Sequence, residues 1–178
     1  TAAAYGQGIS QTYIGEVMAT RRSEVFLATK TNNRTRDGSL RLLEQSLNLL
    51  KTDRLDLWQL HNISRIEQLD QIFADDGAIH ALLRAREEGI VRFLGITGHA
   101  NPKVLLEGLN RFPFDTILMA LNPADRYFLP FQEKLLPTAN ERGMGVIAMK
   151  IPARGRIFRE GGLPSMRLPT LDMTLALQ

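Results

Sequence analysis

Polar side chains that could perform acid–base chemistry stand at the ends of short apolar runs in this sequence. Lys30 ends the run that begins at Val25, His61 ends the run that begins at Leu55, and Tyr5 follows a short apolar stretch. A phenol, with a reference pKa of about 10, donates its proton slowly at neutral pH. A neighbouring ammonium favours the phenolate, and an imidazole can orient a carbonyl oxygen. Tyr5, Lys30 and His61 could therefore protonate a carbonyl group as it is reduced.

Each of these residues has a simpler explanation when it is taken alone. A lone tyrosine is usually a packing or surface residue, a lysine at a strand end can be a solvated charge, and a single histidine is often a core residue. Together, at equivalent strand ends, they are better explained as one site. A lyase or aldolase that forms a Schiff base through Lys30 or Lys150 stays open, because buried lysines can become nucleophilic.

The apolar runs themselves predict a parallel β-sheet. They are continuous rather than alternating, as in strands covered on both faces, and roughly 25 to 35 residues separate them, which is room for a βαβ unit. Thr1 to Ala3 could be the tail of an earlier strand. The five expected strands are Val25 to Lys30, Leu55 to His61, Val91 to Thr97, Thr116 to Asn122, and Val146 to Lys150.

Helical patterns fill the intervals between these runs, with apolar residues at steps of three and four. Strict alternation of strands and helices leaves a closed barrel or an open doubly wound sheet. No G-x-G-x-x-G loop follows an expected strand, which favours the barrel. The expected helices span Leu40 to Leu50, Ala78 to Leu83, Asn101 to Leu109 and Phe131 to Ala139, with another beginning near Thr170, after an irregular stretch over Arg154 to Pro169.

Composition excludes several classes of protein. The net charge is only +3 and the basic residues are interleaved with acidic ones, so nucleic acid is not an expected partner. There is no cysteine, which excludes disulfides and makes the cytoplasm the default location. No apolar run reaches the ~18 residues that cross a bilayer. His61, His80 and His99 share no ligand spacing, so we expect no metal. We expect one domain over residues 1–178.

Ordered motifs over most of the chain resemble the aldo-keto reductase family. T-A-A-A-Y-G at 1–6 resembles D-T-A-x-x-Y-G, whose aspartate falls one position before Thr1. The segments at 10–15, 25–30, 55–61 and 89–96 resemble the family's S-E-x-x-[LI]-G, its strand ending in Thr-Lys, D-L-x-x-x-H, and G-K-V-R-x-I-G-V. The resemblance implies an incomplete (β/α)8 barrel of the TIM type, with about five full strands plus part of an earlier one and both ends outside this sequence.

The resemblance also implies a reaction. Tyr5 would be the general acid, Lys30 its cationic partner and His61 the group that orients the substrate. A nicotinamide cofactor would supply hydride to a small aldehyde or ketone. NADPH is the expected cofactor, NADH is possible, and the oligomeric state stays open.

The family's cofactor-binding positions are partly altered here. Thr97 and Gly98 stand where many members have a Ser-Asn pair that holds the carboxamide, and Leu118 stands where they have glutamine. Glycine and leucine donate nothing from their side chains, so His99 or Asn122 would have to substitute. A non-catalytic barrel that binds the cofactor as a sensor or docking module therefore stays open. The remaining expected cofactor contacts are Met149 against the ring and Lys150, Arg154 and Gly155 along the phosphates.

Overall fold

Five parallel strands form one sheet in the computed structural model, which describes residues 1–123 and 128–152. Their order in the sheet is their order in the chain. A doubly wound sheet reverses its strand order part-way, whereas a barrel does not, so this order is that of a barrel. The strands are β1 (Ala28–Thr31), β2 (Leu55–Leu60), β3 (Val91–Gly98), β4 (Thr116–Ala120) and β5 (Gly145–Met149).

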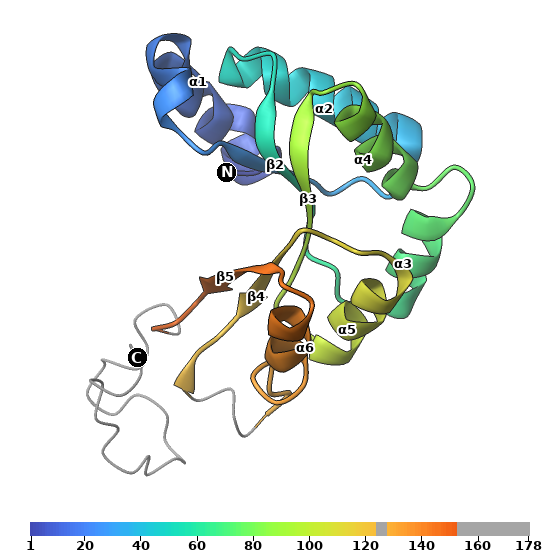
Figure 1. Cartoon of the computed structure of the whole chain (residues 1–178). Coiled ribbons are helices and arrows are strands. Elements are labelled where there is room, and N and C mark those ends of the chain that lie inside the picture. Colours follow the sequence, from blue (N-terminus) through green and yellow to red (C-terminus); the bar gives the residue numbers. More distant parts are fainter. Residues whose placement is uncertain (124–127, 153–178) are drawn as a thin grey trace.

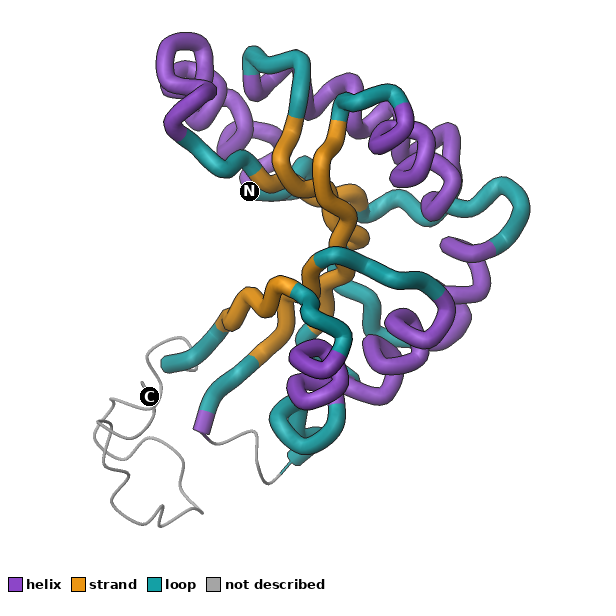
Figure 2. Tube along the Cα trace, viewed as in Figure 1, coloured by secondary structure: helices purple, strands orange, loops and turns teal. Residues whose placement is uncertain are grey.

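The helices connect these strands and lie along the outer side of a curved sheet (Figure 1). In Figure 2 the strands form an arc that is open on the side away from α2 to α6. The helices are α1 (Ile9–Arg21), α2 (Arg36–Leu50), α3 (Ile66–Phe73), α4 (Ala78–Glu87), α5 (Pro102–Arg111) and α6 (Leu135–Glu141), with two short 3₁₀ turns, η1 (Tyr5–Gly8) and η2 (Arg22–Glu24).

The main core lies between the helices and the sheet, where Leu43, Leu82 and Leu105 are among its buried members. β2 is buried along its whole length, as its continuous apolar run predicts, and includes Trp58 at 1% exposure. β5 is the last strand of the described sheet and is partly exposed there. Helix α5 begins as expected, because the Asn101 side chain accepts a hydrogen bond from the Lys103 N–H at 3.0 Å.

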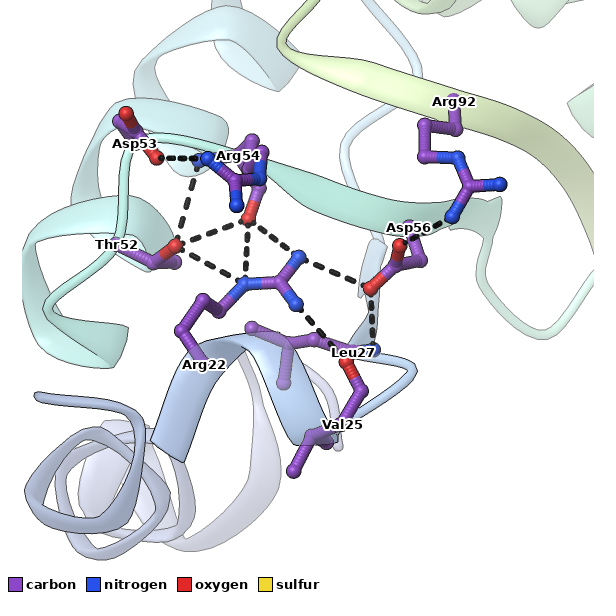
Figure 3. Close-up of polar contacts among 8 residues, drawn as sticks. All are labelled: Arg22, Val25, Leu27, Thr52, Asp53, Arg54, Asp56 and Arg92. Atoms are coloured by element: carbon purple, nitrogen blue, oxygen red, sulfur yellow. Dashed lines mark hydrogen bonds and ion pairs between the residues drawn. The ribbon is translucent and has the colours of Figure 1, made fainter. Parts of the chain in front are cut away.

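The first expected strand is wrong over Val25 to Leu27, because the strand begins only at Ala28. The Leu27 N–H donates to the Asp56 carboxylate at 2.8 Å instead of to a strand backbone. The same carboxylate accepts from Arg22 and from Arg92, each at 2.9 Å (Figure 3). A side chain distant in the sequence thus takes the place of a ladder bond.

Other boundaries also differ from the expected ones. Thr1 to Ala3 is not a strand, and α6 begins at Leu135 rather than at Phe131. The strands expected to reach His61, Asn122 and Lys150 end one or two residues earlier, at Leu60, Ala120 and Met149. Helix α3 was not expected. The irregular stretch and last helix that we expected after Arg154 lie outside the described residues.

Candidate active site

The carboxyl-terminal ends of β1 and β2 bring Lys30 and His61 beside Tyr5. The Lys30 ammonium nitrogen lies 5.3 Å from the centre of the Tyr5 ring. The Tyr5 and His61 rings are 5.7 Å apart at 74°, in edge-to-face contact. Tyr5 is 45% exposed, whereas Lys30 is 7% exposed. The three residues expected at one site therefore meet, with a buried amine beside an accessible phenol.

Local backbone geometry explains how Tyr5 reaches this position. The Thr1 nitrogen donates to the Ala28 carbonyl at 3.1 Å, which places the first residues alongside β1. Lys30 donates from Nζ to the Thr1 carbonyl at 2.7 Å, so the amine is held on the same segment. Tyr5 then begins η1, in which Gly6 and Gly8 have positive φ angles of 58° and 95°. These two left-handed glycines turn the chain into α1 directly after Tyr5.

The electrostatics of the site favour an uncharged imidazole. Burial lowers the pKa of Lys30 from its ordinary value. Burial, followed by the nearby charges of Lys30, Arg34 and His99, lowers the pKa of His61 to about 4. His61 is therefore neutral at pH 7, where one ring nitrogen carries a proton and can donate a hydrogen bond.

The two expected carboxamide contacts lie at the end of β3, where they pack against the loop after β2. The buried Thr97 hydroxyl oxygen accepts from the Asn62 N–H at 2.8 Å, and the Thr97 carbonyl accepts from the Ile63 N–H at 2.7 Å. A Cβ atom added to Gly98 would lie 2.5 Å from the Ile63 carbonyl oxygen. The loop after β2 thus occupies the space that a side chain at position 98 would need.

The other described cofactor positions lie at the same edge of the sheet. Asn122 follows β4, and its carbonyl accepts from the Gln132 side chain at 2.9 Å. Met149 ends β5 and Lys150 follows it with a positive φ of 61°. All three are half-buried. Arg154 and Gly155 lie outside the described residues.

One residue beside the site was not expected from the sequence. Arg34 follows β1 and donates from Nη2 to the His61 carbonyl at 2.8 Å. No sequence motif marks this contact, because its acceptor is a backbone atom. Within the described part of the chain, no group of three or more histidine and carboxylate side chains could hold a metal, and no helix is long and apolar enough to span a membrane.

This arrangement agrees with the comparisons to known proteins. A sequence model of the aldo/keto reductase family matches residues 1–164, so the chain belongs to that family. An uncharacterized oxidoreductase of Bacillus subtilis, YqkF, is 30% identical over 167 residues, which are 87% of this chain and 51% of that protein. L-galactose dehydrogenase of Arabidopsis thaliana is 29% identical over 172 residues, with 88% and 51% covered. The chain spans about half the length of these two curated relatives.

Solved structures agree with the fold. The holo form of an aldo-keto reductase from Bacillus halodurans superposes with a TM-score of 0.71 at 27% identity, covering 97% of this chain and 55% of that one. An aldo-keto reductase from Klebsiella pneumoniae in complex with NADPH gives 0.73 at 22% identity, covering 90% and 55%. The five strands thus correspond to part of a TIM barrel, as the family resemblance of the sequence implies.

Proposed function

We propose that the protein is an oxidoreductase that converts an aldehyde or ketone to an alcohol with a nicotinamide cofactor. The observation that carries the proposal is the meeting of Tyr5, Lys30 and His61 at one edge of the sheet. Family membership and the relatives named as oxidoreductase and dehydrogenase support the same class of reaction.

Each of the three side chains has one role in this proposal. The Tyr5 hydroxyl gives its proton to the carbonyl oxygen, and the Lys30 ammonium stabilises the phenolate that remains. The neutral His61 ring donates a hydrogen bond to the same oxygen and orients it. The bound cofactor supplies hydride to the carbonyl carbon.

The cofactor would be held along the ends of β3 to β5. The Thr97 hydroxyl accepts a backbone bond with its oxygen and keeps its proton to donate to a carboxamide oxygen. Gly98 would contribute through its backbone, Met149 against the ring, and Asn122 and Lys150 through polar contacts. We propose Arg154 and Gly155 as phosphate contacts on the sequence pattern alone. NADPH is the proposed cofactor, with NADH as the other possibility.

The Tyr5→Phe substitution tests the proposal in the full-length protein. Steady-state oxidation of NADPH should be measured with a panel of small aldehydes. Loss of the general acid should lower kcat at least about 100-fold, as removal of a positioned proton donor does. Tyr13→Phe is the matched control, because Tyr13 is 72% exposed on α1, and it should retain full activity. Equal activity in wild type and Tyr5→Phe would refute the assignment.

Schiff-base chemistry is the second candidate, and the burial of Lys30 with its lowered pKa favours it. Reduction with borohydride in the presence of a carbonyl compound would trap an adduct on Lys30, which peptide mass spectrometry would locate. We expect no adduct. A Lys30 adduct in a protein that does not oxidise NADPH would replace the reductase proposal with this one.

A further inference from the structure

We propose that Arg34 is a positioning residue that fixes the backbone of His61 and adds positive charge beside its ring. The inference rests on the proposed function, because it assigns Arg34 a part in presenting His61 to the substrate. Arg34 is contributed by the loop between β1 and α2, and it would act through His61 without touching the substrate.

The role of Arg34 follows from the point at which β1 ends. The His61 N–H donates to the Thr31 carbonyl at 2.8 Å, one step beyond the paired residues of β1 and β2. In a parallel ladder, the N–H two residues after Thr31 would then donate to the His61 carbonyl. That N–H belongs to Asn33, and it donates instead to the Thr31 hydroxyl oxygen at 3.2 Å. The Arg34 guanidinium takes its place, at 2.8 Å from the His61 oxygen.

β3 holds the other side of the loop that follows β2 and begins at His61. Thr97 accepts from the N–H groups of Asn62 and Ile63, and Asn62 has a left-handed φ of 55°. Asparagine adopts this conformation more readily than other non-glycine residues, so it suits the turn. His61 therefore stands at the start of a turn fixed by β3 on one side and by Arg34 on the other.

The backbone of Arg34 is itself well fixed. Its carbonyl accepts from the Ala78 N–H at 2.9 Å, at the start of α4. The next residue, Thr35, pairs with Gly77 in an isolated bridge, and its hydroxyl accepts from the Gly38 N–H at the start of α2. The guanidinium thus extends toward His61 from a segment held between the starts of two helices.

Stability alone is a poor explanation for an arginine here. Its Nη1 is buried without a hydrogen-bond partner, and no carboxylate lies within ion-pair distance of it, as far as the described residues go. A buried, incompletely paired cation costs free energy. The contact with His61 supplies a reason to keep it in this position.

Charge adds a second effect. The groups that face His61 are Lys30 on β1, Arg34 in the following loop, His99 after β3, and the ring of Tyr5. The cations among them oppose a positive charge on the imidazole. Arg34 is one of these cations, so its removal should make His61 easier to protonate.

Three variants of the full-length protein test the proposal: Arg34→Met, Arg34→Lys and, as matched control, Arg36→Met. Arg36 lies in the same segment, but its side chain is 48% exposed and pairs with Asp37. The measurements are kcat and KM with NADPH and an aldehyde, and the His61 pKa from NMR titration. Arg34→Met should lower kcat about tenfold, the effect of a small misplacement at a site, with KM changed less than about twofold. It should also raise the His61 pKa.

Arg34→Lys should keep the His61 pKa low and recover part of kcat, whereas Arg36→Met should resemble wild type in both. If Arg34→Met does not fold, the lysine variant is used for the test. Lysine keeps the positive charge but lacks the planar guanidinium group that donates to the His61 carbonyl. The proposal is overturned if kcat and the His61 pKa are unchanged in the Arg34 variants, or if activity falls only in proportion to thermal stability. The NMR titration needs no turnover, so it tests Arg34 even if the protein oxidises no NADPH.

Discussion

The three candidate catalytic side chains differ in their exposed fraction. Lys30 is buried and bonded to the Thr1 carbonyl, whereas nearly half of Tyr5 is exposed. His61 lies between these extremes and touches the Tyr5 ring by its edge. The Lys30 ammonium is thus shielded from solvent, where a charge acts more strongly on its neighbours than it does in water.

His61 should make the stability of the protein depend on pH. Its folded pKa is about 4 and its ordinary value is 6.5, so the unfolded chain binds more protons between these values. Its contribution is complete above pH 6.5 and decreases as the pH falls toward 4. Urea unfolding at pH 6.5 and 5 should differ by roughly 1 kcal/mol more in wild type than in His61→Gln, since solvent screens the half-buried ring.

His80→Gln is the control for this measurement. His80 is exposed on α4, away from the site, and this variant should keep the pH dependence of wild type. An unchanged pH dependence in His61→Gln would mean that His61 does not have a lowered pKa in the folded protein.

The sequence predicts residues of the site that have distinctive chemistry at a strand end. Lys30 and His61 satisfy that condition, whereas Tyr5 follows a segment that is not a strand; the structure brings the three residues together. Arg34 does not satisfy the condition, because its partner is the carbonyl of a residue 27 positions away and no side-chain pattern encodes such a contact. The tight packing of Gly98 against Ile63 could not be predicted from the sequence either, because it depends on how β2 and β3 pair.

At the scale of elements, the Asp56 carboxylate joins the starts of the first three strands, at the end of β2 opposite to His61. It binds the Leu27 amide, Arg22 from η2 and Arg92 on β3 (Figure 3). Burial alone would raise the pKa of Asp56, but the Leu27 amide and the two guanidinium groups together hold it below its usual value. The charged form of Asp56 therefore stabilises the fold at neutral pH.

Asp56→Asn should destabilise the protein by about 2 kcal/mol, because it leaves two arginines facing a neutral group in a partly buried place. Asp53→Asn is the matched control. Asp53 is 84% exposed at the side chain, and its contact with Arg54 is 3.7 Å long, so its loss should change stability by less than about 0.5 kcal/mol. Chemical unfolding at pH 7 measures both. Equal stability of Asp56→Asn and wild type would contradict a stabilising role for this network.

Helices were predictable where the signal, an apolar repeat or a capping residue, lies within one continuous segment. The leucine pattern from Leu40 to Leu50 and the cap at Asn101 are contained in single segments, and α2 and α5 form there. Helix α3 could also have been predicted, because Ile66, Leu69, Ile72 and Phe73 recur at helical spacing and Leu69 and Ile72 are buried. Val25 to Leu27 is apolar like a strand, but the Asp56 side chain takes the amide of Leu27, and a contact over 29 positions is not part of any local pattern.

At the scale of the whole molecule, chain order determines where the site residues lie. Because the strands are all parallel, every carboxyl end lies at one edge of the curved sheet, and because they pair in sequence order, consecutive strand ends are adjacent. Residues that follow β1 and β2 therefore become neighbours, and the expected cofactor contacts follow along β3 to β5. The alternation of strands and helices predicts parallel strands joined by crossover helices, and the absence of a G-x-G-x-x-G loop favours this order over that of a doubly wound sheet.

The central claim is that Tyr5 and Lys30 act as one proton-transferring unit. A double-mutant cycle tests it most directly, with kcat/KM measured for wild type, Tyr5→Phe, Lys30→Met and the double variant at saturating NADPH. Residues that act as a unit are not additive, so the double variant should lose no more than about the larger of the two single losses. Losses that multiply, or a Tyr5→Phe variant as active as wild type, would contradict the claim.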